Sequence, residues 1–338
     1  MKEWKDTMKH ILLISTGGTI ATKKTDHGLS PQITSEEILE CVPQVRSFCQ
    51  VETVQLFNID SSNMQPENWV AIAKTIQQRY NEFDGFLITH GTDTMVYTAA
   101  ALSYLIQDSP KPIVLTGSQK SISYPDTDAR LNLSDAFTYC ASADACGVHV
   151  VFGGKVIVGT RARKIRTKSY DAFDSINYPA VASIRDGRFY YYIKEQLGTK
   201  GPSFQLNLCP DVFLLRLVPG MDAGIFEYLK TRYEAVVIES FGVGGLPAYG
   251  EFSQGIQDWI ASGRHLVMAT QVPGEGSDME VYEVGYVSKK QYHLMEAYDM
   301  TTEAALVKLM WILGTTKDPN EIRSLFYTPV QNDILTVG

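Results

Sequence analysis

The sequence predicts an α/β protein with two domains. Short, nearly continuous apolar segments alternate with helical patterns, which is typical of parallel strands covered by helices on both faces. A chain of 338 residues is also long enough for two domains of ordinary size. The alternation lapses once, where Gly, Pro and polar residues accumulate over residues 196–210. We therefore expect a larger N-terminal domain (1–195), a linker (196–210) and a smaller C-terminal domain (211–338), each with a mainly parallel sheet.

The first three predicted strands each end in small polar residues. Residues 10–15 lead into Thr-Gly-Gly-Thr, residues 85–89 into His-Gly-Thr-Asp-Thr, and residues 111–115 into Thr-Gly-Ser. Because these strands are apolar along their whole length, we expect them to be buried on both faces of one sheet.

Helices are expected between these strands. Apolar residues recur every three or four positions from Pro66 to Phe83, which predicts an amphipathic helix with the proline in its first turn. A second helix is expected to begin near Asp93 or Thr94, and a third to cover residues 129–141. In the C-terminal domain we expect strands over 212–217, 235–240 and 266–270, and helices over 252–262 and 302–313.

The charge balance excludes generic nucleic-acid binding. There are 38 acidic and 30 basic residues, so the formal net charge is −8, which repels a polyanion. The first apolar run, residues 11–14, is too short for the core of a signal peptide or for a membrane helix. We therefore expect a cytoplasmic protein that binds neither nucleic acid nor membrane.

No metal or cofactor is expected. The five cysteines include no CxxC pair and the six histidines show no i,i+4 pairing, so neither a disulfide framework nor a zinc site is indicated. The sequence also lacks a GxGxxG motif placed after a strand, as well as GxxxxGK[ST], GxSxG and HExxH. The simplest arguments for a nucleotide cofactor, a hydrolase serine or a zinc protease are therefore missing.

The informative side chains lie where the predicted strands end. Since ligands of parallel α/β sheets bind beyond the carboxyl ends of the strands, these side chains are expected to converge on one crevice. They are Thr16, Thr19, Thr89, Thr92, Asp93, Thr116 and Ser118. Thr19 follows two glycines that let the backbone approach a reacting carbonyl, so its hydroxyl is a candidate nucleophile beside amides that could stabilise an oxyanion.

These patterns also have structural interpretations. A Thr-Gly-Gly-Thr segment occurs equally well in a turn that lets a helix pack on a sheet, and Thr92 and Asp93 are both good helix N-caps. Lys168 could act as a base if burial keeps it neutral, but a lysine in a charged segment such as 161–171 is more often solvated. The residues alone leave these alternatives open.

Together the motifs resemble those of the bacterial L-asparaginase and glutaminase family, most closely its cytosolic type I branch. Two signatures carry the resemblance, residues 16–21 (TGGTIA) and 85–94 (GFLITHGTDT). Supporting segments follow in the expected order at 59–64 (IDSSNM), 115–119 (LTGSQ), 167–173 (TKSYDAF), 239–245 (ESFGVGG) and 269–271 (ATQ). The resemblance implies an asparaginase-like fold, no cofactor, and homodimers that often pair into tetramers.

The resemblance also implies a mechanism. Thr19 would attack the side-chain amide of asparagine, expel ammonia and leave a β-aspartyl ester that water hydrolyses. Thr92, Asp93 and Lys168 would form a second triad, in which a neutral lysine takes a proton from the threonine or, through it, from the water.

The same resemblance assigns the residues that would hold the substrate. Asp93 would also pair with the α-ammonium group of asparagine, and Ser61, supported by Asp60 and Ser62, would bind its α-carboxylate. Thr92 and Ser118 would line the same pocket. These contacts would place the amide over the nucleophile, where orientation can supply much of the rate.

Two departures from the family pattern stand out. The loop after the nucleophile has Leu29 where the family usually has a tyrosine, so either another group, such as Lys168 or Tyr124, activates Thr19, or the loop acts chiefly as a lid. Some type I members also have an asparagine-activating site with an arginine and a cysteine where this chain has Glu239 and Val272. A carboxylate cannot replace a guanidinium in binding a carboxylate, so we expect this form of allostery to be weak or absent.

The sequence therefore predicts an L-asparagine amidohydrolase, with three alternatives. A glutaminase-asparaginase and an amidotransferase subunit that supplies ammonia to tRNA-linked chemistry belong to the same class. The acidic charge and the lack of an added N-terminal domain count against the amidotransferase. From a different class, an amino-acid sensor that has lost catalysis would bind asparagine without turnover.

Overall fold

The structure is a computed structural model that describes residues 8–25, 28–194, 201–247, 251–281, 286, 289–290, 292 and 294–335. Residues 24, 25 and 28–31 are described by their backbone alone. The chain divides into two compact units, one of residues 1–175 and 179–206 and the other of residues 176–178 and 207–338. In the described part, no helix is long and apolar enough to cross a membrane.

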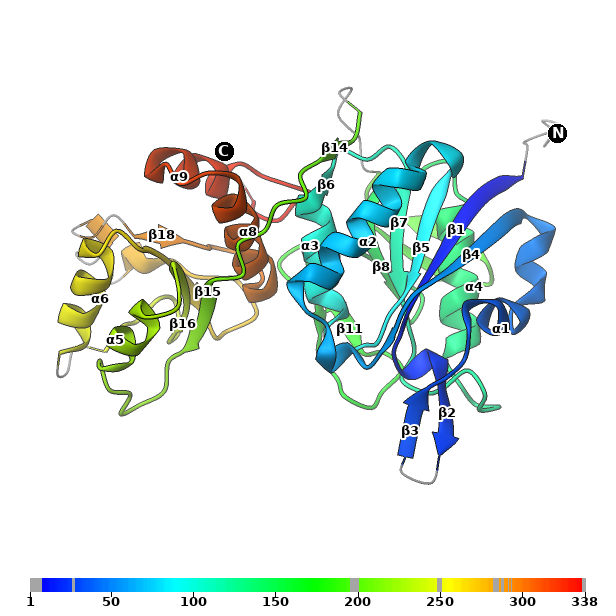
Figure 1. Ribbon diagram of the computed structural model, residues 1–338, viewed down its shortest axis with the longest axis horizontal. Coiled ribbons are helices and arrows are strands. Elements are labelled where there is room, and N and C mark those ends of the chain that lie inside the picture. The colour runs from blue at the N-terminus through cyan, green and yellow to red at the C-terminus, as the bar shows by residue number, and fades with distance from the viewer. Residues whose placement is uncertain are drawn as a thin grey trace. The chain divides into compact units, whose positions relative to one another are not determined.

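The N-terminal unit is built on an eight-stranded sheet (Figure 1). Its strands are β1 (Lys9–Gly17), β4 (Cys49–Ile59), β5 (Gly85–Thr89), β7 (Pro112–Thr116), β8 (Gly147–Phe152), β9 (Lys155–Val158), β12 (Ala182–Arg185) and β13 (Arg188–Tyr191). They lie in the order β13-β12-β9-β8-β7-β5-β1-β4, with β4, β1, β5, β7 and β8 parallel and the other three antiparallel. The predicted α/β class with a mainly parallel sheet is confirmed.

The antiparallel edge of this sheet follows from two tight hairpins. Gly153 and Gly154 connect β8 to β9, and Asp186 and Gly187 connect β12 to β13. All four residues have positive φ angles, between 50° and 73°. Two-residue turns of this kind match the twist of adjacent antiparallel strands, which explains why the parallel order stops at β8.

The predicted helices of this unit form with small shifts at their ends. They are α1 (Ser35–Glu40), α2 (Pro66–Arg79), α3 (Met95–Leu105) and α4 (Ala129–Cys140). The helix predicted from Pro66 to Phe83 ends its α-helical part at Arg79 and continues as the short 3-10 helix η4 (Tyr80–Glu82). Helix α3 is apolar around its circumference because it is buried on nearly every side.

Smaller elements lie around the sheet. The strands β2 (Thr22–Thr25) and β3 (Gly28–Pro31) form a hairpin, β10 (Ala162–Lys164) pairs with β11 (Phe173–Ser175), and β6 (Ile106–Gln107) pairs with β14 (Ser203–Phe204). The 3-10 helices are η1 (Thr19–Ala21), η2 (Pro43–Ser47) and η3 (Ser61–Asn63). Part of the predicted linker, 196–200, lies outside the described residues, and β14 within it is a strand of the N-terminal unit.

The C-terminal unit has a four-stranded parallel sheet in the order β15-β16-β17-β18. Its strands are β15 (Val212–Arg216), β16 (Ala235–Ser240), β17 (His265–Thr270) and β18 (Met295–Glu296), and its helices are α5 (Ile225–Lys230), α6 (Phe252–Ala261), η5 (Met279–Val281), α8 (Thr302–Thr315) and α9 (Pro319–Tyr327). Apolar side chains of α5 and α6 pack on one set of alternating strand residues, whereas α8 packs against β15, β16 and β17. The predicted parallel sheet of the second domain is confirmed.

Candidate active site

The loops that follow β1 and β5 are in backbone contact at the carboxyl edge of the large sheet. Gly18 has a φ angle of 79°, and a Cβ atom there would lie 2.3 Å from the backbone nitrogen of Gly91. A Cβ atom on Gly91 would lie 2.5 Å from Oγ of Ser61. Because only glycine fits at either position, the Thr-Gly-Gly-Thr segment serves a contact between loops rather than the packing of a helix on the sheet.

Thr19 follows this contact directly and begins the 3-10 helix η1. Its side chain is half-buried, and within the described part of the chain its hydroxyl makes no hydrogen bond. Its carbonyl accepts a hydrogen bond of 2.8 Å from Oγ1 of Thr22, which holds the turn. The N–H of Gly18 donates to the carbonyl of Ile59 at 2.9 Å, so an oxyanion would need a different amide. The geometry leaves the Thr19 hydroxyl available to react.

Four of the side chains that were predicted to line one crevice are instead buried and make hydrogen bonds inside the protein. They are Thr16, Thr89, Thr116 and Ser118. The Thr16 hydroxyl donates to the Thr89 carbonyl at 2.9 Å, and the Thr116 hydroxyl donates to the Val151 carbonyl at 2.7 Å. These side chains are at most 1% exposed, as is Thr89. The expectation that they line the crevice is therefore wrong, since their hydroxyls satisfy buried polar groups.

The Ser118 side chain is also buried inside the protein. Its hydroxyl donates to the Lys120 carbonyl, and the residue has no exposed surface. This internal partner leaves Ser118 no open face toward a substrate. The residue that faces Thr92 from this loop is its neighbour Gln119, the last residue of the 115–119 segment, for which the sequence predicted no role.

Thr92 and Asp93 are joined to a lysine, and that lysine is Lys164. Its ammonium group lies 2.8 Å from Oγ1 of Thr92 and 2.6 Å from Oδ1 of Asp93. The Lys164 side chain is 15% exposed, whereas that of Asp93 is 66% exposed. Neither Thr92 nor Asp93 caps helix α3, because its N-cap position is occupied by Thr94. Thr92, Asp93 and Lys164 therefore form a hydrogen-bonded group whose carboxylate is open to solvent.

The prediction of Lys168 for this place is corrected to Lys164. Lys164 is the last residue of β10, which packs against α3, and the first turn of α3 follows Asp93. Lys168 lies four residues further along, in the segment between β10 and β11, and is exposed. Both lysines stand in the same charged segment, and pairing of β10 with β11 selects the one that reaches the threonine.

Asp60, Ser61 and Ser62 form a small cap at the end of β4. The Asp60 carboxylate accepts hydrogen bonds from the hydroxyl of Ser62 at 2.7 Å and from its backbone N–H at 2.8 Å, and these bonds hold the pKa of Asp60 below its ordinary value. The Ser61 side chain is buried beside Gly91, and its carbonyl accepts a hydrogen bond of 2.8 Å from the Thr94 hydroxyl. Asp60 and Ser62 thus fix the turn that carries Ser61.

His90 supports the β5 loop from within the sheet. It has no exposed surface, and its Nδ1 lies 2.7 Å from the Gly91 carbonyl and its Nε2 2.9 Å from Oγ1 of Thr98. Since a carbonyl can only accept, Nδ1 carries the hydrogen and Nε2 accepts from the threonine. Burial lowers the pKa of His90 to about 4, so the imidazole is neutral at ordinary pH.

His90 and Asp135 are expected to give opposite pH dependences of stability. The pKa of His90 is lowered from 6.5 to about 4, so its stabilising contribution, complete above pH 6.5, is lost as the pH falls toward 4. Burial raises the pKa of Asp135, on α4, from 3.8 to about 6, so its contribution is present at low pH and is lost as the pH rises through 6. Each shift corresponds to about 3 kcal/mol.

Urea unfolding at pH 7 and pH 4.5 measures this balance. Relative to the wild type, His90→Gln should gain about 2 kcal/mol on acidification, and Asp135→Asn should lose about 2 kcal/mol. Equal responses of the two variants and the wild type would contradict the assignment of these two groups.

The loop that holds Leu29 is described by its backbone only. Leu29 pairs with Lys24 in the β2–β3 hairpin, and its side chain lies outside the described residues. The sequence alone therefore shows that this position has no tyrosine hydroxyl.

Glu239 and Val272 lie at the carboxyl edge of the small sheet. The Glu239 carboxylate accepts a hydrogen bond of 2.8 Å from the Thr302 hydroxyl and lies 3.3 Å from a guanidinium nitrogen of Arg216. The Glu239 side chain is 5% exposed. Val272 is exposed and its N–H donates to the Thr270 hydroxyl. Both carboxylate oxygens of Glu239 thus have internal partners.

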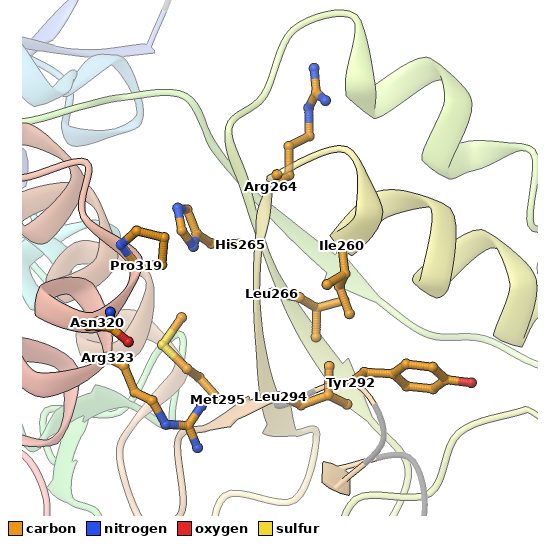
Figure 2. Close-up of a pocket in the computed structure, with 11 residues that line it drawn as sticks. Ile260, Arg264, His265, Leu266, Tyr292, Leu294, Met295, Pro319, Asn320 and Arg323 are labelled. Atoms are coloured by element: carbon orange, nitrogen blue, oxygen red, sulfur yellow. The ribbon is translucent and has the colours of Figure 1, made fainter.

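The C-terminal unit also has a cavity of about 590 Å³, which contains none of the predicted site residues. In Figure 2 its floor is apolar, with Leu266 and Leu294, and the Arg264 side chain points away from it. The Arg264 guanidinium donates to the carbonyls of Tyr233 and Lys230. Because its charge is already used, we assign no ligand to this cavity.

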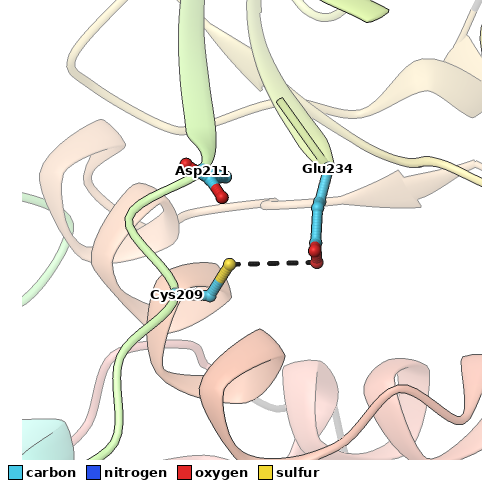
Figure 3. Close-up of side chains that lie close together, drawn as sticks. All are labelled: Cys209, Asp211 and Glu234. Atoms are coloured by element: carbon cyan, nitrogen blue, oxygen red, sulfur yellow. Dashed lines mark hydrogen bonds between the residues drawn. The ribbon is translucent and has the colours of Figure 1, made fainter. Parts of the chain in front are cut away.

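Cys209, Asp211 and Glu234 are the one group of metal-ligating side chains found together within the described residues (Figure 3). Their ligand atoms lie within 4.8 Å of one another. The Glu234 carboxylate is paired with Lys317, and burial raises the pKa of the Cys209 thiol. A protonated thiol and a paired carboxylate are poor ligands, so we assign no metal to this group.

Two family models match this chain. Residues 10–197 match the family model "Asparaginase, N-terminal" and residues 211–326 match "Glutaminase/Asparaginase C-terminal domain". The chain is 37% identical to the L-asparaginase of Thermococcus kodakarensis over 325 residues, which covers 96% of this chain and 98% of that protein. It is also 35% identical over 341 residues to a subunit of the glutamyl-tRNA(Gln) amidotransferase of Pyrococcus furiosus, covering 96% of this chain and 76% of that protein.

Solved structures of L-asparaginases share the fold of this chain along nearly its whole length. The thermostable L-asparaginase from Thermococcus kodakarensis superposes with a TM-score of 0.92 at 36% identity, covering 97% of this chain and all of that chain. A probable cytoplasmic L-asparaginase from Campylobacter jejuni superposes with a TM-score of 0.82 at 27% identity, covering 94% and 99% of the two chains. With both family domains matched and the fold shared along nearly the whole chain, this protein belongs to the asparaginase family.

Proposed function

We propose that the protein hydrolyses L-asparagine to L-aspartate and ammonia, with Thr19 as the nucleophile. The observation that carries the proposal is the hydrogen-bonded group of Lys164, Thr92 and Asp93. Thr92 and Asp93 stand on the loop that contacts the turn of Thr19. Within the described residues the Thr19 hydroxyl makes no hydrogen bond. Covalent hydrolysis needs a nucleophile and a base that a third group orients, and Thr19 together with the Lys164, Thr92 and Asp93 group would supply them.

The proposed reaction has two steps. The Thr19 oxygen bonds to the side-chain amide carbon, the C–N bond breaks, and the hydroxyl proton leaves with the nitrogen as ammonia. Water then attacks the resulting β-aspartyl ester, aspartate departs, and the Thr19 oxygen regains a proton. In the second step neutral Lys164 takes the proton of the water through Thr92, and Asp93 stabilises the ammonium ion that forms.

Substrate binding would prepare the lysine for this role. Asp93 is 66% exposed and can accept the α-ammonium group of asparagine as well as Lys164. A second positive charge beside Lys164 favours loss of its proton, which produces the neutral base. We propose that Ser61 binds the α-carboxylate and that Asp60 and Ser62 hold it in position.

We also propose a cytoplasmic, type I enzyme without a cofactor. The domain division at 1–195, 196–210 and 211–338 belongs to this proposal, as does a homodimer or homotetramer. In such an assembly the C-terminal domain of one protomer would complete the site of its neighbour. A cytoplasmic location agrees with the name of the Campylobacter jejuni protein, which is called a probable cytoplasmic L-asparaginase.

A second candidate is an ammonia-supplying amidotransferase subunit. The observation that favours it is the 35% identity to the Pyrococcus furiosus amidotransferase protein over nearly the whole of this chain. The two functions differ in whether tRNA-linked chemistry is needed for turnover, so an assay without tRNA separates them.

The deciding experiment measures ammonia release from L-asparagine and L-glutamine by the purified chain without tRNA. Steady turnover of asparagine supports the proposal, and its ratio to glutamine turnover gives the selectivity. Binding of asparagine in a calorimeter with no ammonia above that of Thr19→Ala would make the protein a sensor. Turnover only with a charged tRNA and partner subunits would favour the amidotransferase.

The buried position of Glu239 predicts a simple dependence of rate on substrate. Its carboxylate stands where the activating arginine would be and is held by Thr302 and Arg216, so it cannot bind an activating carboxylate. Initial rates should follow a hyperbola in asparagine concentration. A sigmoidal curve would contradict the prediction that activation by asparagine is weak or absent in this chain.

A further inference from the structure

Gln119 links the Thr92 hydroxyl to a turn of the neighbouring segment. Its Oε1 lies 3.3 Å from Oγ1 of Thr92, and its Nε2 lies 3.4 Å from the Arg166 carbonyl and 3.2 Å from the Ser169 carbonyl. Because the two carbonyls can only accept, the amide is oriented with its nitrogen toward the turn and its oxygen toward Thr92. The side chain therefore has a fixed direction at the site.

The backbone of Gln119 is held just as firmly. The Asp128 carboxylate accepts hydrogen bonds of 2.9 and 3.1 Å from the N–H of Gln119, and one of 3.1 Å from that of Lys120. Asp128 is 7% exposed, and Asn132 donates to it at 3.2 Å. The two residues at the start of α4 thus fix the loop from which Gln119 reaches Thr92.

The direction of the Thr92 hydrogen depends on Lys164. An ammonium group only donates, so the Thr92 oxygen must accept from Lys164 at 2.8 Å and direct its own hydrogen elsewhere. The acceptor it finds is Oε1 of Gln119. A neutral Lys164 would instead accept that hydrogen. The hydrogen bond from Thr92 to Gln119 is long, at 3.3 Å, so it is weak. Replacing it with a hydrogen bond from Thr92 to neutral Lys164 therefore costs little free energy.

We propose that Gln119 is a positioning residue that holds the Thr92 hydrogen away from Lys164 in the resting enzyme. This inference rests on the proposed function, because it concerns the proton path through Thr92. The charged groups at this path are Lys164 and Asp93 at the hydroxyl, Asp128 at the backbone of Gln119, and the Arg166–Asp171 ion pair on the turn. The ammonium group of Lys120, on the same loop, pairs with Asp126 instead. Gln119 is a neutral group that hydrogen-bonds to the Thr92 hydroxyl and to two backbone carbonyls of the turn.

Two substitutions of Gln119 should move the pH dependence of turnover in opposite directions. Gln119→Met keeps the size of the side chain and removes the acceptor, so Thr92 can donate to a neutral Lys164, and the pH of half-maximal kcat falls. Gln119→Glu adds a carboxylate that favours the ammonium form of Lys164, so this pH rises. We expect kcat to fall about tenfold in both and KM to stay within about twofold, since Gln119 does not hold the substrate.

Lys120→Met is the matched control, because Lys120 stands on the same loop and pairs with Asp126 instead. Its pH profile should equal that of the wild type. Shifts of the same sign in both Gln119 variants, or none, would overturn the inference even if wild-type turnover of asparagine is established.

A second measurement does not need activity. Reductive methylation of Lys164 requires its neutral amine, and mass spectrometry can follow it as a function of pH in the same proteins. The midpoint should fall in Gln119→Met and rise in Gln119→Glu, and unchanged midpoints would overturn the inference. Absence of wild-type turnover would instead count against the proposed function alone.

Discussion

Thr19→Ala should lower kcat for L-asparagine at least about 1,000-fold. The substitution removes the one oxygen that forms the covalent ester, and no other described hydroxyl of this turn is free to replace it, because that of Thr22 donates to the Thr19 carbonyl. Asparagine should still bind, since the groups proposed to hold it are unchanged. Ammonia release and calorimetry together measure both quantities.

Thr19→Ser is the matched variant for this test. It keeps an oxygen at the same place and loses only a methyl group, so it should recover a large part of the rate and should form an ester. Trapping of a mass increment on residue 19 after acid quenching would identify the intermediate. Full activity of Thr19→Ala would remove Thr19 from the mechanism and with it the proposed reaction.

Lys164→Met should lower kcat by about 10²- to 10⁴-fold, whereas Lys168→Met should leave it within about twofold. Only Lys164 reaches Thr92 and Asp93, at 2.8 and 2.6 Å, and its loss removes the proposed base for the water. Lys168 is exposed, and an exposed charge of this kind contributes little. The two variants remove the same charge from the same segment, so each is the control for the other.

Steady-state kinetics with asparagine measures this pair. The reverse result, an active Lys164→Met and an inactive Lys168→Met, would restore the prediction made from the sequence. Lys164→Arg adds a further test, because it keeps the positive charge beside Asp93 but cannot act as a base. It should be as slow as Lys164→Met if proton transfer is the function of this side chain.

Much of the fold could be predicted from local patterns. The parallel strands were found because they are apolar along their length and end in small polar residues, and helix α2 because its apolar residues repeat at helical spacing. The antiparallel edge was not found, although Gly153-Gly154 and Asp186-Gly187 are both signals for tight hairpins. These dipeptides are the sequence features that could have revealed it.

Much less of the site could be predicted in this way. Position at a strand end does not tell whether a hydroxyl faces the crevice or the interior, because a hydroxyl such as that of Thr16 or Thr116 can satisfy a buried carbonyl instead. Gln119 carried no signal of its own, since a glutamine becomes informative only when its two amide atoms have partners. Those partners come from segments far apart in the chain.

The sequence by itself determined the α/β class, the Thr-Gly-Gly-Thr turn and the acidic loop that bears Thr92 and Asp93, because strand burial and tight turns depend on neighbouring residues. The tertiary structure decided which lysine completes the group. Lys164 and Lys168 are the same type of residue and lie in one charged segment, so the sequence does not distinguish them. They differ in that Lys164 ends a strand packed on helix α3, and no local pattern specifies that contact between distant segments.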